Sequence, residues 1–372
     1  MGVLFENLLN ITWQQVVMWV IGGLLIWLAI KKDMEPSLLL PMGFGAILVN
    51  LPFSGAVNQF VDGVLEQGPI DVLFGAGIAN ELFPLLLFIG IGAMIDFGPL
   101  LSNPKMLLFG AGAQFGIFFT LSVASLFGFE MKDAASIAII GAADGPTSIF
   151  VANFLKSNYI GAIVVAAYSY MALVPIVQPA VIRMITTKKE RCIKMPYVQR
   201  EVSKTTRILF PIVITIIAGV VAPRSVALIG FLMFGNLLRE CGVLNSLSET
   251  AQKVLANLIT LLLGLTIATK MQADSFLNPA TLLIMGLGLV AFVFDTVGGV
   301  LLAKFMNLFS KNKINPMVGA AGISAFPMSA RVINKMGLKE DPQNFLLMHA
   351  VGANVAGQIA SVIAGGLLLA LI

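Results

Sequence analysis

The sequence has 372 residues, of which 58% are hydrophobic and only 11% are charged. A typical soluble domain carries about 25% charged residues, so this composition excludes an ordinary soluble enzyme or binding domain. Apolar runs such as "MLLFGAGAQFGIFFTLSVASLFGF" reach the roughly 20 residues that a helix needs to span a bilayer. The net charge of +4 does not indicate nucleic-acid binding, because its location along the chain explains it. The composition therefore predicts an all-α polytopic membrane protein embedded in lipid.

Apolar segments follow one another along the chain in two series. The first series predicts membrane segments at about 13–30, 36–52, 82–98, 106–128 and 159–183, with an interrupted segment at 134–155. The second predicts segments at about 208–222, 224–239, 254–269, 279–309 and 343–371, with an interrupted segment at 315–333. Between them lies the polar, basic stretch 184–206, which predicts a linker. The chain thus divides into a first membrane repeat, 1–183, the linker, 184–206, and a second membrane repeat, 207–372.

The two series also share residue patterns in the same order, which indicates an internal duplication. "PSLLLPMGFGAILVN" in the first repeat resembles "PRSVALIGFLMFGN" in the second, with Gly-Phe at the same distance from Pro. "NPKMLLFG" likewise parallels "NPATLLIMG". The interrupted segments contain "PTSIFVAN" and "PMSARVIN", which share Pro-x-Ser-x-x-Val-x-Asn, and each follows a "GAA".

The distribution of positive charge predicts how the repeats are oriented. If each interrupted segment is a re-entrant hairpin, each repeat crosses the membrane about five times, and the second repeat is inverted. With the linker cytoplasmic, 19 of the 23 Lys and Arg residues lie in cytoplasmic connections, as the positive-inside rule requires. Both termini are then extracytoplasmic. Inverted repeats with broken helices are typical of ion-coupled transporters, in which the site lies between the breaks. We therefore expect an elevator-like core that moves against a scaffold containing 36–51 and 222–238, and oligomer contacts on that scaffold.

The first interrupted segment contains a candidate cation site. In "IAIIGAADGPTSIFVANFL", Gly141, Gly145 and Pro146 break an apolar stretch beside Asp144. A carboxylate at bilayer depth costs about 2.5–3.5 kcal/mol on insertion scales, so it is typical of a functional site. Unwound backbone frees carbonyl oxygens, and together with a carboxylate these suit a small hard cation such as Na⁺. The alternative is a kinked helix whose Asp144 side chain extends to the membrane interface.

The second interrupted segment and the last helix supply further polar candidates. Asn315 and Ser324 offer neutral oxygens, although Asn315 before a Pro is equally well placed to be a helix N-cap. Arg331 follows the break and is either a functional cation or an ordinary positive-inside residue. In "HAVGANVAGQIAS" the polar residues Asn354, Gln358 and Ser361 recur at helical spacing on one face. This stripe must face protein or water rather than lipid, either as a site or as a contact between helices.

Tyr170, in "AAYSYMALVP", offers a phenol that can give or accept a proton, or else belongs to an interfacial tyrosine belt.

"GAADGPTSIF", "GISAFPMSARV" and "GANVAG" resemble the membrane β subunit of the sodium-pumping, biotin-dependent decarboxylases of oxaloacetate, methylmalonyl-CoA and glutaconyl-CoA. The resemblance covers nearly the whole chain. It implies a subunit in the bacterial cytoplasmic (inner) membrane that decarboxylates carboxybiotin and exports Na⁺. It also implies a biotin carrier subunit, a carboxyltransferase subunit and a small membrane subunit as partners. The roles that it assigns are catalytic for Arg331, Tyr170 and Asp144, sodium binding for Asp144, Asn315, Ser324 and Asn354, and carboxybiotin binding for Arg331.

Energetic reasoning is compatible with this resemblance. Moving one Na⁺ outward against about 100 mV costs about 2.3 kcal/mol. The sequence has no G-x-x-x-x-G-K-[ST] phosphate loop, so the energy has to come from another gradient or from a reactive group such as carboxybiotin. The alternative function is a secondary Na⁺/carboxylate symporter with inverted repeats, in which Arg331 binds the substrate carboxylate. The compact chain favours an acyl-CoA decarboxylase complex over an oxaloacetate one.

Overall fold

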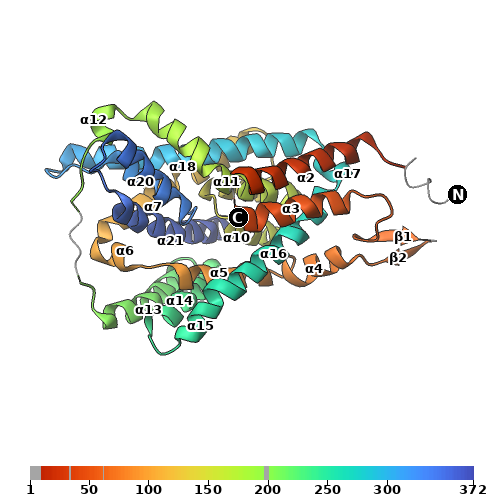
Figure 1. Cartoon of the computed structure of the whole chain (residues 1–372), viewed down its shortest axis with the longest axis horizontal. Helices are drawn as coiled ribbons and strands as arrows, with labels where there is room; N and C mark the ends of the chain where they lie inside the picture. The colour runs from red at the N-terminus through yellow and green to blue at the C-terminus, as the bar shows by residue number, and fades with distance from the viewer. Residues whose placement is uncertain (1–9, 33–34, 62, 197–200) are drawn as a thin grey trace.

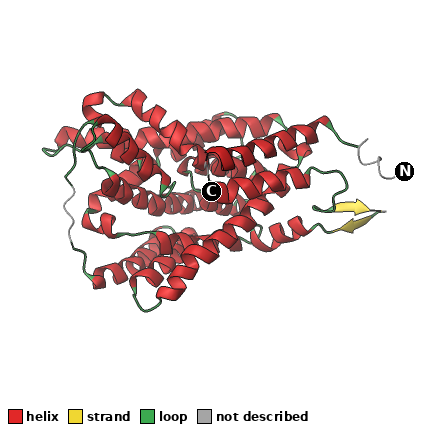
Figure 2. Cartoon of the chain, in the orientation of Figure 1, coloured by secondary structure: helices red, strands yellow, loops and turns green. Residues whose placement is uncertain are grey.

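The computed structural model describes residues 10–32, 35–61, 63–196 and 201–372, and most of them are helical (Figure 2). In these parts of the chain the one sheet is a short antiparallel pair, β1 (Gln59–Val61) and β2 (Val64–Glu66). Figure 1 places this pair at one end of the helical bundle and the short helix α12 (Lys188–Arg191) of the linker at the opposite end. The all-α fold is confirmed, whereas the small sheet was not expected from the sequence.

The first half of the chain contains α2 to α11. The 3₁₀ segments η1 and η2 adjoin α7 and α9, respectively. The bounds are α2 (Trp13–Lys32), α3 (Pro36–Val49), α4 (Pro69–Gly77), α5 (Leu82–Met94), α6 (Gly98–Ser102), η1 (Pro104–Met106), α7 (Leu107–Ala113), α8 (Phe115–Leu126), α9 (Met131–Ala138), η2 (Ile139–Ala142), α10 (Gly145–Phe154) and α11 (Ile160–Ile185).

The second half begins after the linker, of which residues 197–200 lie outside the described part. One irregular segment, η4, is a π-helix, and η3 and η5 are 3₁₀ segments. The bounds are α13 (Lys204–Val221), η3 (Pro223–Ser225), α14 (Val226–Glu240), α15 (Asn245–Glu249), η4 (Thr250–Leu255), α16 (Ala256–Ile267), η5 (Ala268–Met271), α17 (Ala273–Phe276), α18 (Pro279–Phe309), α19 (Pro316–Ala320), α20 (Met328–Glu340) and α21 (Leu347–Leu371).

Within the described residues, six helices are long and apolar enough to span a membrane, and two bent helix pairs raise the number to eight. The protein is therefore a multi-pass membrane protein. The sequence led us to expect ten crossings, and the two segments that fall short are α3, with 14 residues, and α14, with 15. At about 1.5 Å per residue these helices are shorter than a hydrocarbon core of about 30 Å.

Helix α11 is one of the bent spans, and the chain turns by 69° between 160–171 and 173–185. Pro175 explains the position of the bend. Its ring lacks the N–H that would otherwise bond to the carbonyl of Met171, four residues earlier, and it clashes with that carbonyl. Helix α11 packs against α10, α18 and α20, and Gln178, which follows the bend, donates to the hydroxyl of Ser329 on α20 at 2.8 Å.

The helices form two packed groups. In the first helix group, α5 packs against α14 and α3 packs against α16. Helix α2 lies alongside α3, and α13 lies alongside α14. In the other group α18 packs against α7, α8, α11 and α19, and α21 packs against α7 and α20. Figure 1 shows α5, α13 and α14 together on one side of the molecule, and α7, α18, α20 and α21 on the other.

Two buried asparagines fasten the ends of the helices in the first group. Asn50, just after α3, donates to the carbonyls of Ala46 and Met271 at 2.8 Å and accepts from the N–H of Ala273 at 2.8 Å. Asn236, near the end of α14, donates to the carbonyl of Ile95 at 3.1 Å. Each asparagine therefore caps a helix of the other half of the chain, satisfying carbonyl or N–H groups that a helix end leaves without partners.

Close backbone contact between α5 and α14 depends on glycine on both sides. A Cβ at Gly92 would lie 1.8 Å from the carbonyl oxygen of Leu232, and a Cβ at Gly235 would lie 2.0 Å from that of Ile89. Small residues are the usual means of such close approach between membrane helices, where packing rather than the hydrophobic effect holds helices together.

Candidate functional site

The first interrupted segment is broken where the sequence predicted. Helix α9 tightens into η2, Ala143 takes a left-handed conformation with φ 51°, and α10 begins at Gly145. Asp144 is the N-cap of α10, and Pro146 occupies the first turn, where its missing N–H costs nothing. The break therefore aims the positive end of the α10 dipole and the Asp144 carboxylate at the same place.

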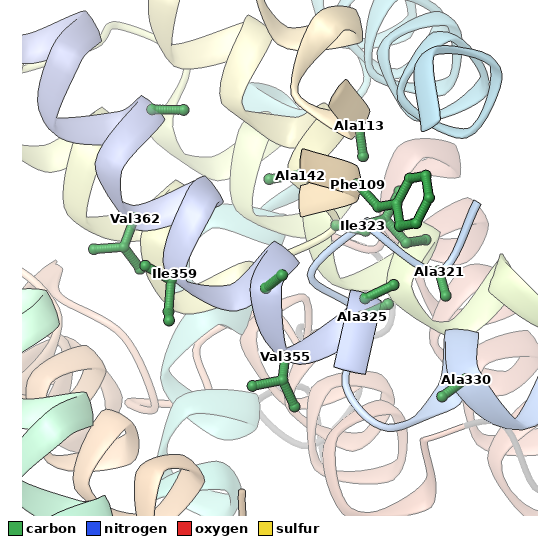
Figure 3. Packing of buried hydrophobic residues seen from close by; sticks show 14 of the residues in the cluster. Phe109, Ala113, Ala142, Ala321, Ile323, Ala325, Ala330, Val355, Ile359 and Val362 are labelled. Atoms are coloured by element: carbon green, nitrogen blue, oxygen red, sulfur yellow. The ribbon is translucent and has the colours of Figure 1, made fainter. Parts of the chain in front are cut away.

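The second interrupted segment is broken as well, and the irregular residues at its break contact those of the first segment. We call these two breaks the tips. Helix α19 ends at Ala320 and α20 begins at Met328, with irregular backbone between them. The N–H of Ser324 donates to the carbonyl of Ala142 at 3.0 Å, which joins the two breaks directly. Figure 3 shows Ala142 and Ile323 on the same side of the α21 ribbon, with Val355, Ile359 and Val362 of α21 on its other side. Such irregular backbone is tolerated at membrane depth only where protein covers it, and here both tips are buried.

The polar stripe of α21 is buried against protein, as its spacing predicted, and the structure shows that it faces both tips. Asn354 donates to the carbonyl of Ile323 at 2.6 Å, and the amide nitrogen of Gln358 donates to the carbonyl of Ser324. Ser361 donates to Oδ2 of Asp144 at 3.2 Å. The stripe thus satisfies carbonyls that the second break exposes and also supports the carboxylate of the first.

Close approach of α21 to the second tip depends on Gly357. A Cβ there would lie 2.2 Å from the carbonyl oxygen of Gly322. Ser324 uses this proximity, because its hydroxyl donates to the carbonyl of Gly357 at 2.9 Å. The small residues of "GANVAG" therefore serve to bring helix and tip together.

Asp144 is buried, and hydroxyl groups surround its carboxylate. Oδ2 accepts from the Thr147 hydroxyl at 2.6 Å and from Ser361 at 3.2 Å, and Oδ1 faces the N–H of Thr147 at 3.5 Å. Among the described residues Asp144 has no basic partner, since none of the ion pairs found there includes it. A buried carboxylate without a cationic partner is unusual unless it binds a cation or a proton.

A cavity of about 270 Å³ lies between the two tips and the first helix group. The tips contribute Ala143, Asp144, Ser324, Phe326 and Pro327, and α3, α5 and α16 form the opposite wall. The charged residues in this lining are both acidic, Asp144 and Glu35, and no basic side chain is among them. The remaining polar side chains of the lining are Ser37, Tyr168, Asn257, Thr260 and Gln358.

The structure places Tyr168, rather than Tyr170, in this lining. The ring of Tyr168 lies over Gly145, so that a Cβ at Gly145 would be 2.2 Å from its Cζ. The hydroxyl of Tyr170 points elsewhere and donates to the carbonyl of Met285 on α18. Two residues on a helix differ by about 200° in direction, so the two tyrosines cannot face the same site. A catalytic role for Tyr170 stays a prediction, and Tyr168 was missed from the sequence.

Asn315 lies outside the cavity lining. Its Oδ1 caps α19 by accepting from the N–H of Met317 at 3.1 Å, and its Nδ2 donates to the carbonyls of Arg191 and Ile193 in the linker. The polar atoms of Asn315 are therefore engaged in holding the base of the second hairpin to the linker. This is the N-cap role that the sequence left open, and a sodium-binding role for Asn315 stays a prediction.

Arg331 lies on the first turn of α20, four residues beyond the cavity-lining Pro327, and its side chain is exposed. Lys335 and Lys339 follow at intervals of four, so that the three cations share one face of the helix. In the described part of the chain none of them forms an ion pair, whereas other basic residues nearby do, such as Arg191 with Glu340 at 2.8 Å. An exposed guanidinium free of partners is suited to bind a carboxylate from outside the chain.

These features define a class: a multi-pass α-helical membrane protein in which two broken segments meet at a buried carboxylate. Residues 14–372 match the family of the Na⁺-transporting oxaloacetate decarboxylase beta subunit, and the chain belongs to this family. It is 49% identical to the methylmalonyl-CoA decarboxylase subunit beta of Propionigenium modestum over 96% of this chain and 94% of that protein. It is 48% identical to the glutaconyl-CoA decarboxylase subunit beta of Acidaminococcus fermentans over 97% of this chain and 94% of that protein. It is 45% identical to the oxaloacetate decarboxylase beta chain of Klebsiella pneumoniae over 95% of this chain and 94% of that protein.

Proposed function

We propose that this chain is the membrane subunit of a sodium pump that decarboxylates carboxybiotin, delivered by a carrier subunit, and couples this reaction to Na⁺ export. The observation that carries the proposal is the cavity between the two broken tips. Its only charged lining residues, within the described part of the chain, are the acids Asp144 and Glu35. Such a lining attracts a cation and repels an anion, so the cavity suits Na⁺ as the transported substrate.

The same lining disfavours the alternative of a Na⁺/carboxylate symporter. A symporter has to hold its carboxylate substrate near the cation, and this cavity has no basic group among its lining residues to do so. Arg331 lies one turn outside the cavity, on the side that the positive charge predicts to be cytoplasmic. We assign it to the carboxyl group of carboxybiotin, with Lys335 and Lys339 attracting the anionic partner that delivers it.

In the proposed reaction, carboxybiotin supplies an N–carboxyl bond whose cleavage releases CO₂ and leaves a ureido nitrogen that takes a proton. Arg331 orients the carboxyl group through two parallel hydrogen bonds. Asp144 holds Na⁺ together with neutral oxygen atoms, for which the candidates named from the sequence are Ser324 on the second tip, Asn354 on α21 and Asn315 at the start of α19. Tyr170 stays a candidate proton donor.

We further propose that the two tips and α21 move as one core against the first helix group. The tips are joined by the hydrogen bond from Ser324 to Ala142, and both are bonded to α21. The opposite wall of the cavity belongs to α3, α5 and α16. Because the cavity lies at this boundary, sliding of the core along the wall would carry Asp144 between the two sides of the membrane without separating the tips.

The contacts between the helices support inverted repeats. By position in the two halves, α3 corresponds to α14 and α5 to α16. The contact of α5 with α14 therefore has its counterpart in the contact of α3 with α16. The asparagine ties at Asn50 and Asn236 are reciprocal in the same way. A two-fold relation produces reciprocal contacts of this kind, and we place both termini outside the cytoplasm on the charge distribution.

Alignment length favours an acyl-CoA as the substrate of the complex. The alignment with the Klebsiella protein extends over 409 positions, more than the 372 residues of this chain, so that relative has inserted segments. The alignments with the methylmalonyl-CoA and glutaconyl-CoA relatives extend over only 373 and 361 positions. The acyl-CoA itself would be bound by the carboxyltransferase subunit, which we propose as a partner together with the biotin carrier and a small membrane subunit.

The test is to reconstitute the purified chain in liposomes and to follow ²²Na⁺ uptake and CO₂ release after addition of free carboxybiotin. We expect uptake that needs no other gradient and stops when carboxybiotin is exhausted. Uptake driven by a carboxylate gradient, with no response to carboxybiotin, would establish the symporter instead.

A further inference from the structure

Two side chains in the cavity have buried oxygen atoms without partners. The hydroxyl of Tyr168 and Oε1 of Gln358 are both buried, both residues line the cavity, and neither atom has a hydrogen-bond partner among the described residues. Leaving a buried polar group unsatisfied costs about 1–3 kcal/mol, so a folded protein rarely keeps one unless something else occupies the site. Two such atoms in one cavity beside a carboxylate therefore need an explanation.

The orientation of Gln358 is fixed by its other amide atom. Its Nε2 donates to the carbonyl of Ser324, which can only accept, so the amide cannot turn around without placing two acceptors against each other. Oε1 is thereby held away from the tip. Asn354, one turn earlier, bonds to Ile323 in the same manner, and its Oδ1 is also unpartnered, but Asn354 is not among the residues that line the cavity.

The position of Tyr168 is fixed by packing. Its ring lies against Gly145, next to Asp144, on a part of α11 that is buried. The phenol and the carboxylate line the same cavity but do not bond to each other; Asp144 bonds instead to Thr147 and Ser361. The carboxylate and the two unpartnered oxygens thus belong to residues that line one cavity but come from three elements, the first break, α11 and α21.

The geometry points to Tyr168 and Gln358 as ligands of the cation that Asp144 binds, with the phenol oxygen and Oε1 facing the ion. Hard cations take oxygen ligands, and neutral oxygens from several elements combined with one carboxylate make a site of low net charge. The inference rests on the proposed function, since it assigns ligands to the Na⁺ of that function. It differs from the set expected from the sequence, in which neither residue was included.

If the assignment is correct, the variant Tyr168→Phe should bind Na⁺ more weakly without losing stability. Because the hydroxyl has no partner within the protein, its removal should leave thermal stability in Na⁺-free buffer unchanged or slightly higher. The affinity for ²²Na⁺ should fall about tenfold, which is the loss expected for one neutral ligand. The stabilisation of the protein by added Na⁺ should shift to about tenfold higher concentration.

Two further variants separate binding from folding. Tyr159→Phe removes a phenol from the start of the same helix, where the ring packs edge-on against Phe129 outside the cavity lining, and should leave Na⁺ affinity unchanged. Gln358→Ala removes both the ligand oxygen and the donor to Ser324. It should therefore weaken Na⁺ binding at least tenfold and also lower stability without Na⁺.

The readouts are ²²Na⁺ binding to the detergent-purified full chain and melting temperature as a function of NaCl concentration, with choline chloride as the ionic-strength control. Tyr168→Phe with wild-type Na⁺ affinity would overturn the inference and leave the proposed function standing. A lower melting temperature of Tyr168→Phe without Na⁺, at unchanged affinity, would assign the phenol a structural role instead. Absence of ²²Na⁺ binding by the wild-type chain would overturn the proposed function itself.

Discussion

The substitution Asp144→Asn tests the cation site with little change of shape. Asn and Asp are about equally good N-caps, so α10 should still begin at Gly145. The hydroxyl donors Thr147 and Ser361 lose a charged acceptor, and because hydrogen bonds to charged groups exceed neutral ones by about 1 kcal/mol, we expect a stability change of about 1–2 kcal/mol. The fold should therefore survive.

The expected effect on Na⁺ is much larger than this. A unit charge about 4 Å from a cation is worth about 4 kcal/mol at an effective dielectric constant of about 20. Its loss corresponds to a decrease in Na⁺ affinity of about a thousandfold. Decarboxylation of carboxybiotin and ²²Na⁺ transport should both be lost, because the proposal couples the reaction to occupation of the cation site.

The assay measures ²²Na⁺ binding, transport and melting temperature on one preparation, with Asp133→Asn as the matched control. Asp133 is a buried acid at the start of the same hairpin, and its carboxylate accepts from Ser157 at 2.7 Å and from the N–H of Asn158 at 2.9 Å. Its substitution should lower stability without changing Na⁺ affinity. A folded Asp144→Asn protein that binds Na⁺ within tenfold of wild type would refute the placement of the ion beside Asp144.

Three further predictions follow from other parts of the molecule. Arg331→Lys keeps the charge but loses the planar guanidinium that can form two hydrogen bonds to one carboxylate. Na⁺ binding should stay near normal, while the rate of carboxybiotin decarboxylation should fall at least tenfold. A variant that decarboxylates at the wild-type rate would remove Arg331 from the site. Gly92→Ala places a Cβ 1.8 Å from a backbone oxygen of α14 and should cost about 3 kcal/mol in stability, the upper end of the usual cost of overpacking. Gly23→Ala meets nothing within 4 Å and should be neutral or stabilising. Similar melting temperatures of the two variants would contradict the contact between α5 and α14. The backbone N–H of Gln343, and after it Lys194, hold the pKa of the Asp341 carboxyl below its ordinary value. The contribution of this carboxylate to stability should therefore be present above pH about 4 and disappear as the pH falls below that. In thermal melts, Asp341→Asn should remove this part of the acid dependence.

The sequence predicted the breaks and the polar stripe because each depends on local chemistry. Gly and Pro beside Asp144 interrupt a helix wherever they occur in an apolar segment. Asn354, Gln358 and Ser361 share a face through helical spacing alone. These features need no knowledge of the partner helix, and the structure places the stripe against both tips.

What the sequence could not supply was the direction in which individual side chains point. Tyr168 and Tyr170 are equally plausible in a sequence, and only the packing of α11 on Gly145 decides which of them reaches the cavity. Asn315 was named both as a ligand and as an N-cap, and its hydrogen bonds to the linker depend on the tertiary fold. The length of a half-buried helix such as α3 also could not be predicted, because Asn50 directly after it bonds to Met271 and Ala273 in the other half of the chain.

The reciprocal ties at Asn50 and Asn236 bear on the ancestry of the chain. The contacts that join the two halves are those that two copies of a half-length polypeptide would make with each other, if that polypeptide inserted into the membrane in both orientations. Fusion of the two copies then releases each half to diverge, because a residue no longer has to serve in both positions. Divergence is visible here: Asn50 has partners for its oxygen and its nitrogen, whereas the side-chain oxygen of Asn236 has none among the described residues. In the fused chain, the basic linker fixes the orientation in which each half inserts into the membrane, whereas an unfused ancestor would have inserted in either orientation.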